Sequence, residues 1–280
     1  MPNLIGTVVL YHPDLSLLHN IDSYLESLDL LIAVDNSEHK QLEILEILQK
    51  NPKIRYVDNH GNQGIAHALN VGASIATEMG YRWLLTMDQD SAATEGMIAE
   101  LVRYTDDNVS IVSPFHANAY FPQSLSSEPF SPVLTTMTSG NLLNLQIHQK
   151  LGGFLEELFI DYVDNEYCLR SNLHGYAVIQ ANRAVLHHNL GDLKRHRFLW
   201  KRFFSTNHSP IRRYYAFRNR LKIIELYQKA FPQSCNVEKS RFLVDLIVVL
   251  FYEKQKFAKF KMMVRGSLDY RRNRFGKYHD

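Results

Sequence analysis

The feature that most constrains the fold is an alternation, over the first ninety residues, of short apolar runs with segments of helical periodicity. The runs cover residues 5–11, 30–35, 54–58 and 81–88, and the first three are rich in β-branched residues. Between them, apolar residues recur at every third or fourth position, which is the period of an amphipathic helix. Strands that alternate with helices in this way predict an α/β fold with a mainly parallel sheet and crossover helices.

Polar residues follow these runs at the points where the chain is expected to leave the sheet. They are Asp35, Asp58, Asn62, Asp88 and Asp90. In open parallel sheets, ligands bind in the crevice beyond the carboxyl ends of the strands, so we expect these side chains to border one ligand site. A dinucleotide-binding fingerprint is excluded, because Gly61 and Gly64 follow the third run rather than the first and lack the required spacing.

Asp88 and Asp90 are one residue apart at the end of the fourth run. Side chains alternate along a strand, so both carboxylates are expected on one side of the sheet. Mg²⁺ and Mn²⁺ prefer oxygen ligands and are often shared between protein carboxylates and substrate phosphates, which favours a metal–diphosphate site. The alternative is a helix cap, because Asp and Ser are common helix-start residues and a helix could begin near Ser91.

Composition excludes several classes of protein. The 280 residues are enough for one large or two modest domains with a substantial core. The formal net charge is only +2, which argues against nucleic-acid binding by the chain as a whole. Cys168 and Cys235 are far apart and lack CxxC spacing, so we expect neither a zinc site nor a disulfide framework, and a reducing compartment fits.

The sequence also bears on localisation. The first residues have neither the basic region nor the long apolar region of a secretory signal. The longest apolar run, residues 246–252, is much shorter than the roughly 20 residues that a membrane-spanning helix needs. We expect a cytoplasmic protein, either free or peripheral on the inner face of the cell membrane.

Several short motifs occur in a fixed order along the chain. They are residues 35–37, 59–70, 87–91, 139–141, 158–170, 188–192 and 212–219. Together they resemble the family two glycosyltransferases of the nucleotide-diphospho-sugar transferase (GT-A) fold, and the last two resemble the rhamnosyltransferase branch. The resemblance covers about residues 4–225, and several ordered motifs are hard to obtain by chance. It implies a Rossmann-like sheet flanked by helices.

The resemblance assigns roles at the metal site. It implies that Asp90 holds a divalent cation, Mn²⁺ or Mg²⁺, directly and that Asp88 lies nearer the ribose and the outer shell of the metal. His188 is the expected third ligand, because its spacing to residues 191–192 matches the branch pattern and imidazole suits Mn²⁺. His187 is the competing residue.

The acceptor hydroxyl must lose a proton as it attacks, which requires a carboxylate base. The motif at 158–170 implies that Asp164 is this base, with Asp161 and Glu166 as alternatives. Many relatives have Glu where this chain has Val163. Asp161 and Asp164 could instead cap a helix that starts at Asn165. The resemblance implies inversion at the anomeric carbon without a covalent intermediate.

The nucleotide is expected to meet residues at the strand ends and on the loop and helix that follow the third strand. These are Thr7, Tyr11, Asp35, Asn62 and Asn70. Asp35 would accept a hydrogen bond from the imide of the base. The resemblance adds Arg213 and Arg218, on a segment over the diphosphate, where the planar guanidinium matches phosphate oxygens. The structural alternatives are ordinary packing for Tyr11, a water-facing helix position for Asn70 and an exposed basic helix for the arginines.

We expect a nucleotide-sugar transferase domain at residues 1–220 and a basic helical extension at 221–280. The extension combines apolar positions with many Lys and Arg residues. Such a segment could attach to an anionic membrane face, or it could pack on the main domain or pair two subunits in a homodimer.

The whole pattern predicts an inverting, metal-dependent glycosyltransferase of the cell envelope. Its resemblance to the rhamnosyltransferase branch implies transfer of L-rhamnose from dTDP-L-rhamnose to a surface polysaccharide or lipid-linked glycan. Transfer of another sugar from a UDP or dTDP donor is an alternative. A non-catalytic nucleotide-sugar binding protein that scaffolds polysaccharide assembly is another.

Overall fold

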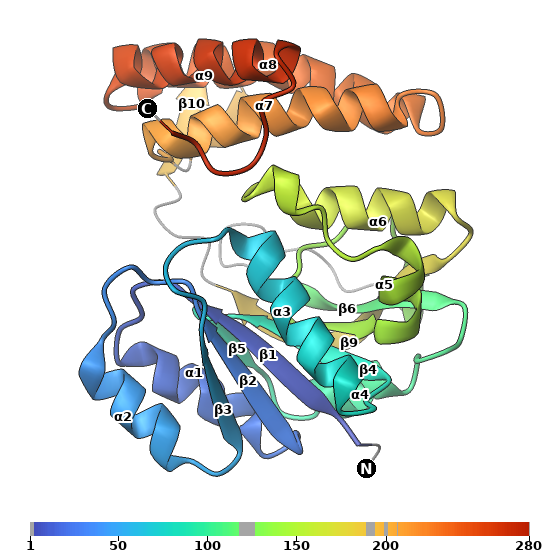
Figure 1. Cartoon of the computed structure of the whole chain (residues 1–280). Helices are drawn as coiled ribbons and strands as arrows, with labels where there is room; N and C mark the ends of the chain where they lie inside the picture. The colour runs from blue at the N-terminus through green and yellow to red at the C-terminus, as the bar shows by residue number, and fades with distance from the viewer. Residues whose placement is uncertain (1–2, 118–126, 189–193, 199–200, 206, 280) are drawn as a thin grey trace. The chain divides into compact units, whose positions relative to one another are not determined.

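The computed structural model describes residues 3–117, 127–188, 194–198, 201–205 and 207–279 (Figure 1). The chain divides into two compact units. The sheet unit consists of Met1–Glu156 and Asp164–Asn189, and the helical unit consists of Glu157–Val163 and Leu190–Asp280. Each unit is described by itself below.

The sheet unit is built on one mixed sheet. Its nine strands in the described residues are β1 (Ile5–Leu10), β2 (Leu30–Asp35), β3 (Ile54–Asp58), β4 (Trp83–Asp88), β5 (Ser91–Ala93), β6 (Val109–Ala117), β7 (Phe130–Pro132), β8 (Asn141–Asn144) and β9 (Ala177–His188). They are ordered β3-β2-β1-β4-β8-β6-β9-β5, with β7 beside β9. The first four run parallel, and β8 is antiparallel to both of its neighbours. The predicted α/β architecture is confirmed.

Helices cover both faces of this sheet. They are α1 (Ser16–Leu25), α2 (Leu42–Lys50), α3 (Ile65–Glu78), α4 (Met97–Val102), α5 (Leu145–Leu151) and α6 (Val163–Leu173), and a 3₁₀ turn spans Glu156–Leu158. The apolar faces of α1, α2 and α4 share one buried cluster with the sheet. The helix α3 packs against β1, β2 and β4, and its buried face is made largely of alanine and glycine (Figure 1). Small residues let this helix approach the strands closely.

The close approach of α3 corrects the prediction for Thr7. Its side chain is fully buried in β1 and its hydroxyl donates to the Ile32 carbonyl at 3.2 Å. A Cβ on Gly72 of α3 would lie 2.3 Å from Thr7 Oγ1, so the helix backbone sits directly on this threonine. Thr7 therefore packs between sheet and helix and is not available to a nucleotide.

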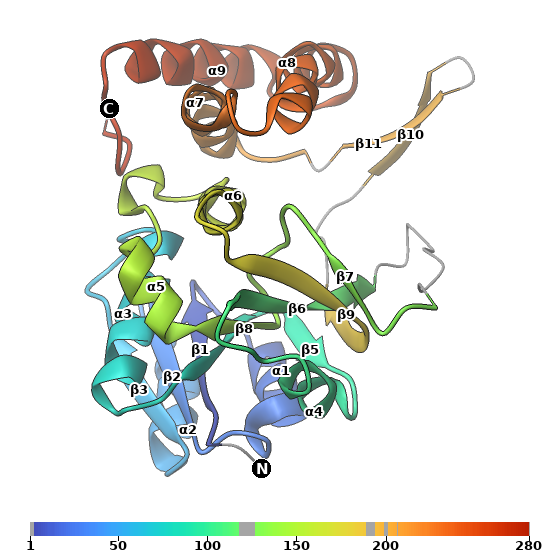
Figure 2. The same ribbon diagram turned by 90° about the vertical axis from the view of Figure 1, so that its right-hand side faces the viewer.

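The helical unit contains α7 (Pro210–Tyr227), α8 (Pro232–Tyr252) and α9 (Lys256–Arg271). Its strands β10 (Lys194–Phe198) and β11 (Lys201–Ser205) pair as an antiparallel ribbon (Figure 2). The boundary expected after residue 220 falls inside α7, which packs against α9 within the helical unit. The contact is so close that a Cβ on Gly266 would lie 2.4 Å from the Tyr214 carbonyl oxygen. Among the described helices, none combines the length and apolar character that crossing a bilayer requires.

Buried ion pairs and hydrogen bonds correct the predictions for Arg213 and Arg218. Arg213 forms an ion pair with Glu253, in which both side chains are buried. Arg218 is fully buried, and its guanidinium donates to the carbonyls of Leu158 at 3.1 Å and Gly276 at 2.8 Å. Both arginines hold the helical unit together, so neither is available as a ligand of the diphosphate.

We predict that Gly140→Ala lowers the free energy of unfolding by about 2–4 kcal/mol. Gly140 has a φ of +80°, and a Cβ there would lie 2.7 Å from Pro114 Cγ and 3.0 Å from Leu186. The matched control is Gly80→Ala, because Gly80 has a φ of +83° and nothing within 4 Å of its Cβ position. Urea unfolding should show a loss of only about 1 kcal/mol for the control. Equal losses would contradict the steric argument.

Candidate active site

The parallel register brings three aspartates to one edge of the sheet. Leu10 at the end of β1 pairs with Asp35 of β2, and Asp35 pairs with Asp58 of β3. On the other side of β1, Val9 pairs with Asp88 of β4. The carboxyl ends of these strands therefore place the three aspartates along one edge of the sheet, as the sequence predicts.

Asp35 is held in place by its neighbours. It is buried, and its carboxylate accepts hydrogen bonds from the Tyr56 hydroxyl and the Ser37 amide, both at 2.8 Å. Lys40 Nζ lies 2.7 Å from Asp58 and 3.6 Å from Asp35. The hydrogen bond from Lys40 lowers the pKa of Asp58. These hydrogen bonds fix the position of the Asp35 carboxylate, and Lys40 partly compensates the negative charge of Asp35 and Asp58.

The loop after β3 is pinned to the end of β2. Asn36 donates to the Gly64 carbonyl at 3.0 Å, and Asn59 donates to the Asn36 side chain at 2.6 Å. Asn62 accepts a hydrogen bond from the Gly64 amide at 3.0 Å, directly before α3. At the end of β1, Tyr11 is 45% exposed. Asn62 and Tyr11 therefore stay close to the strand ends, as predicted.

Asn70 has a different position from the one expected. Its side-chain amide donates to the Phe154 carbonyl and to Glu156, both at 2.9 Å, and its oxygen accepts from the Phe154 amide at 2.9 Å. These bonds tie α3 to the segment before the 3₁₀ turn. The nucleotide-binding prediction for Asn70 is corrected, because its hydrogen-bonding groups are already engaged in the fold.

Gln89 fixes the backbone between the two aspartates. Its side-chain oxygen accepts from the Tyr11 amide at 2.7 Å, and its side-chain nitrogen donates to the Tyr11 carbonyl at 3.1 Å. The Asp88 amide donates to the Ser139 hydroxyl at 3.0 Å. Ser91 starts strand β5 and α4 starts only at Met97, so the alternative of a helix cap at Ser91 is wrong.

Asp88 lies close to two other carboxylates. Burial, followed by the charges of Asp90 and Asp164, raises the pKa of Asp88 to about 7. The influence of Asp164 shows that residues 76 positions apart in sequence meet at this site. A cation beside Asp88 would offset the repulsion that Asp90 and Asp164 exert on its carboxylate.

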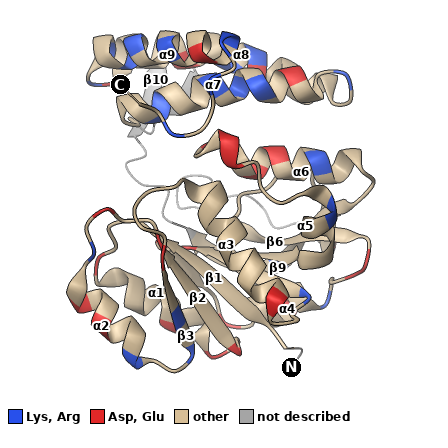
Figure 3. Cartoon of the chain, viewed as in Figure 1, with Lys and Arg blue, Asp and Glu red and all other residues tan. Residues whose placement is uncertain are grey.

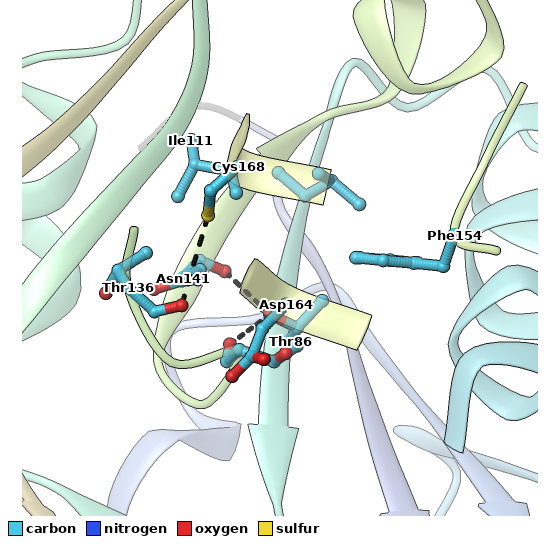
Figure 4. Close-up of a pocket in the computed structure, with 9 residues that line it drawn as sticks. Thr86, Ile111, Thr136, Asn141, Phe154, Asp164 and Cys168 are labelled. Carbon is cyan, nitrogen blue, oxygen red and sulfur yellow. Dashed lines mark hydrogen bonds between the residues drawn. The ribbon is translucent and has the colours of Figure 1, made fainter. Parts of the chain in front are cut away.

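Asp164 lines a small pocket of the sheet unit (Figure 4). The other lining residues are Thr86, Ile111, Thr136, Thr138, Asn141, Leu143, Phe154 and Cys168. Asp164 is in the first turn of α6 and accepts from the Asn165 amide at 2.8 Å. The Oδ1 atom of Asn141 is buried and has no hydrogen-bond partner among the described residues. The pocket thus combines a carboxylate, a buried acceptor and apolar walls.

The alternatives to Asp164 are engaged elsewhere. Asp161 belongs to the helical unit and forms a two-pronged ion pair with Arg212, at 2.9 and 2.5 Å. Glu166 is only 1% exposed and pairs with Arg170 at 2.8 Å. Both carboxylates have a structural explanation, which leaves Asp164 as the candidate base.

His188 is the last residue of β9, and its backbone pairs with Ser91, the residue after Asp90. His187 pairs with Ala92 and is exposed. The side chain of His188 and the rest of its motif, residues 189–192, lie outside what the structure describes. Within the described residues no three ligating side chains form a metal site, and Asp88 and Asp90 supply two carboxylates. Two carboxylates suit a hard divalent ion, which prefers oxygen ligands.

Sequence reasoning missed the residues that fix the site. Gln89 has a recognisable signal, because the middle residue of an Asp-x-Asp strand end must face away from the aspartates. Lys40 and Tyr56 have no recognisable signal in the sequence, because each comes close to Asp35 only once the chain has folded.

Comparison with known proteins agrees with this geometry. Residues 14–142 match the family described as glycosyl transferase family 2. The chain is 26% identical to the dTDP-rhamnosyl transferase RfbF of Shigella flexneri, over 95% of each protein. The chain is thus a glycosyltransferase whose residues 14–142 match family 2.

Solved structures support the fold of this transferase. It superposes on residues 1–349 of TarS from S. aureus with a TM-score of 0.62 and 13% identity, over 96% of this chain and 80% of that one. A GalNAc-T7 structure with UDP, GalNAc and Mn²⁺ gives a TM-score of 0.61 and 12% identity, over 84% of this chain. The transferase spans half the length of that GalNAc-T7 chain.

The raised pKa of Asp88 predicts how stability depends on pH without metal. The folded state keeps a proton that the unfolded state releases above the ordinary aspartate pKa of 3.8, so this group lowers stability as pH rises from about 4 to about 7, and the loss stays constant above that. Asp88→Asn should therefore stabilise the metal-free transferase, by about 1–2 kcal/mol more at pH 8 than at pH 5 in urea unfolding.

Asp58→Asn is the control with the opposite sign. The hydrogen bond from Lys40 lowers the pKa of Asp58 in the folded state. The Asp58–Lys40 pair therefore stabilises the fold at pH values above the pKa of Asp58 in the unfolded chain, and this stabilisation is lost as the pH falls through the lower pKa of the folded state. Asp58→Asn should destabilise the transferase at pH 8 and have less effect at low pH. A stabilising Asp58→Asn, or a pH-independent Asp88→Asn, would contradict the charge assignment.

Proposed function

We propose that this transferase moves L-rhamnose from dTDP-L-rhamnose to a hydroxyl of a glycan acceptor, with inversion at the anomeric carbon. The donor proposal is supported by the similarity to RfbF, which extends over almost the whole of both proteins. The proposal of a single-step displacement rests on the separation of roles between Asp164 and the Asp88–Asp90 pair.

The observation that carries the proposal is the nearness of Asp164 to Asp88, whose pKa responds to the charge on Asp164. An inverting transfer needs a base for the incoming hydroxyl and a charge-stabilised place for the departing diphosphate, close to each other. Asp164 lines the pocket, and Asp88 at the end of β4 is close enough for its pKa to respond to the charge on Asp164. Asp164 can take the proton of the acceptor hydroxyl, while Asp88 and Asp90 hold the cation beside the diphosphate of the donor.

In the proposed reaction, the acceptor oxygen forms a bond to the anomeric carbon as the bond from that carbon to the diphosphate oxygen breaks. The acceptor proton moves to the carboxylate of Asp164, and dTDP leaves with the bonding electron pair. Asn141 Oδ1, the buried acceptor in the same pocket, would orient a sugar hydroxyl. Ile111, Leu143 and Phe154 would keep water away from the reacting carbon.

Asp90, Asp88 and His188 would hold the divalent cation, for which we propose Mn²⁺ or Mg²⁺. When bound, the cation would offset the negative charge that develops on the leaving diphosphate. For the nucleotide we propose contacts with Asp35, through the imide of the base, and with Tyr11 and Asn62 at the neighbouring ends.

The acceptor we propose is a growing surface polysaccharide or a lipid-linked glycan of the cell envelope, reached from the cytoplasm. Pairing of two transferase copies is an alternative role for the helical unit.

Replacement of the proposed base tests the mechanism. Asp164→Asn keeps the size of the side chain but removes its ability to take a proton, so kcat should fall about 10²–10⁴-fold. Titration calorimetry should show donor affinity within about threefold of wild type, because the base acts on the acceptor side. Asp161→Asn is the control and should retain turnover. Unchanged turnover for Asp164→Asn would exclude it as the base.

The choice of donor is tested by thermal shift with dTDP-L-rhamnose, other dTDP-sugars and UDP-sugars, each with and without Mn²⁺. We expect dTDP-L-rhamnose with Mn²⁺ to raise the melting temperature most, because ligands stabilise the state that binds them. Asp90→Asn should remove the metal-dependent part of the shift. A larger shift with UDP-sugars would favour the alternative donor, and donor binding without turnover on any glycan acceptor would favour a scaffold protein.

A further inference from the structure

The helical unit has two apolar stripes that no other described part of that unit covers. On α8 the exposed residues are Leu243, Val244, Ile247, Leu250 and Phe251, and on α9 they are Phe257, Phe260, Val264 and Leu268. In each set the spacings of one, three, four and seven or more residues place the side chains on one side of the helix. Phe257 is 91% exposed and Phe251 is 69% exposed, which is unusual for such large apolar side chains.

The two stripes meet at a groove of about 480 Å³. Leu243 and Leu246 of α8 form one wall, Phe260 and Val264 of α9 form the other, and Phe217 of α7 also lines it. The stripes are therefore parts of one surface, which we call the α8–α9 surface. Apolar surfaces of this extent on a protein mark a place where a partner or a membrane binds.

The charges around the α8–α9 surface are mainly positive. Lys254 and Lys256 are exposed between the two helices, and Lys261 and Arg271 are exposed on the same side of α9 as the apolar stripe. Figure 3 shows Lys and Arg recurring along α8 and α9, where Asp and Glu are few. Long basic side chains beside apolar ones are typical of helices that lie in a membrane interface, because the charged ends reach the headgroups.

The acidic residues of α8 and α9 do not offset this charge at the surface. Glu238 pairs with Arg220 and Arg241, and Asp245 pairs with Arg213 and Arg220. Glu253 pairs with Arg213 and Lys259, and both Glu253 and Lys259 are buried. Asp269, also buried, pairs with Arg265. These four acidic residues are thus paired within the helical unit, while Lys254, Lys256, Lys261 and Arg271 stay exposed.

We propose that the α8–α9 surface binds the face of an anionic lipid bilayer. The apolar stripes would enter the boundary between headgroups and acyl chains, and the surrounding lysines and arginines would contact the lipid phosphates. A second copy of the chain fits less well, because a symmetric contact would bring the same basic residues of both copies together. This surface belongs to the helical unit and the aspartate site to the sheet unit, so the inference holds whichever sugar is transferred.

Sedimentation with lipid vesicles tests the proposal on the full-length protein. The transferase should sediment with vesicles that contain about 30 mol % phosphatidylglycerol, bind neutral phosphatidylcholine vesicles at least tenfold less well, and dissociate as salt is raised. Phe257→Glu combined with Val264→Glu should abolish binding. Lys256→Ala combined with Lys261→Ala should weaken it about tenfold or more, at roughly fivefold per charge.

Leu42→Glu is the matched control, because Leu42 is 69% exposed on α2 in the sheet unit. It introduces a glutamate at an exposed apolar position outside the α8–α9 surface and should leave vesicle binding unchanged. Circular dichroism and the thermal shift with dTDP should be the same for all variants, which separates loss of membrane binding from loss of folding or donor binding.

Two outcomes would overturn the proposal. The first is a wild-type protein that does not bind anionic vesicles. The second is binding that survives the two glutamate substitutions. If light scattering then shows a dimer that Phe257→Glu dissociates, the α8–α9 surface is a contact between two copies.

Discussion

The site depends above all on the parallel register of β3, β2, β1 and β4. Parallel strands that are joined by crossover helices all end at the same edge of a sheet, and here the pairing of Asp35 with Asp58 and of Val9 with Asp88 fixes which residues share that edge. A shift of one residue in any pair would turn an aspartate to the other face of the sheet. The register is held by a core in which β-branched residues of β1 and β2 are almost fully buried. The same buried core therefore stabilises the fold and fixes the positions of the carboxylates.

Much of the fold and part of the site could be predicted because the signals are local. Apolar runs of strand length and helical periodicity identify the layers, and the residue after each run identifies the edge of the sheet. Thr7 was misplaced because the sequence does not say how deep along β1 a residue lies or that Gly72 will sit on it. Arg213 and Arg218 were misplaced because their partners, such as Glu253 and Gly276, come from segments more than 35 residues away. A basic motif on a helix has the same local sequence whether it faces a phosphate or a buried carboxylate.

The two units use charge in opposite ways. In the helical unit, Glu253 is paired with Arg213 and Lys259, and the buried Arg218 donates to the backbone carbonyls of Leu158 and Gly276. The buried charges of this unit are thus satisfied within it. In the sheet unit, Asp88 is surrounded by charges of its own sign. A buried charge that has no opposite partner costs free energy, and folded proteins keep such an arrangement mainly where a ligand supplies the missing charge. The contrast points to the aspartates, rather than to the arginines of α7, as the place where a charged ligand binds.

That cost also explains why the strand end is so strongly restrained. Repulsion among Asp88, Asp90 and Asp164 would move a flexible loop apart, and the carboxylates would then have to be gathered again for every ligand. Gln89 prevents this by holding the Tyr11 backbone through two hydrogen bonds, while Ser139 accepts from the Asp88 amide. The fold therefore bears the repulsion before any ligand arrives. If a cation and a diphosphate bind there as proposed, they would gain the electrostatic interaction without the free energy of rearranging the site, which is the advantage of a preorganised site in catalysis.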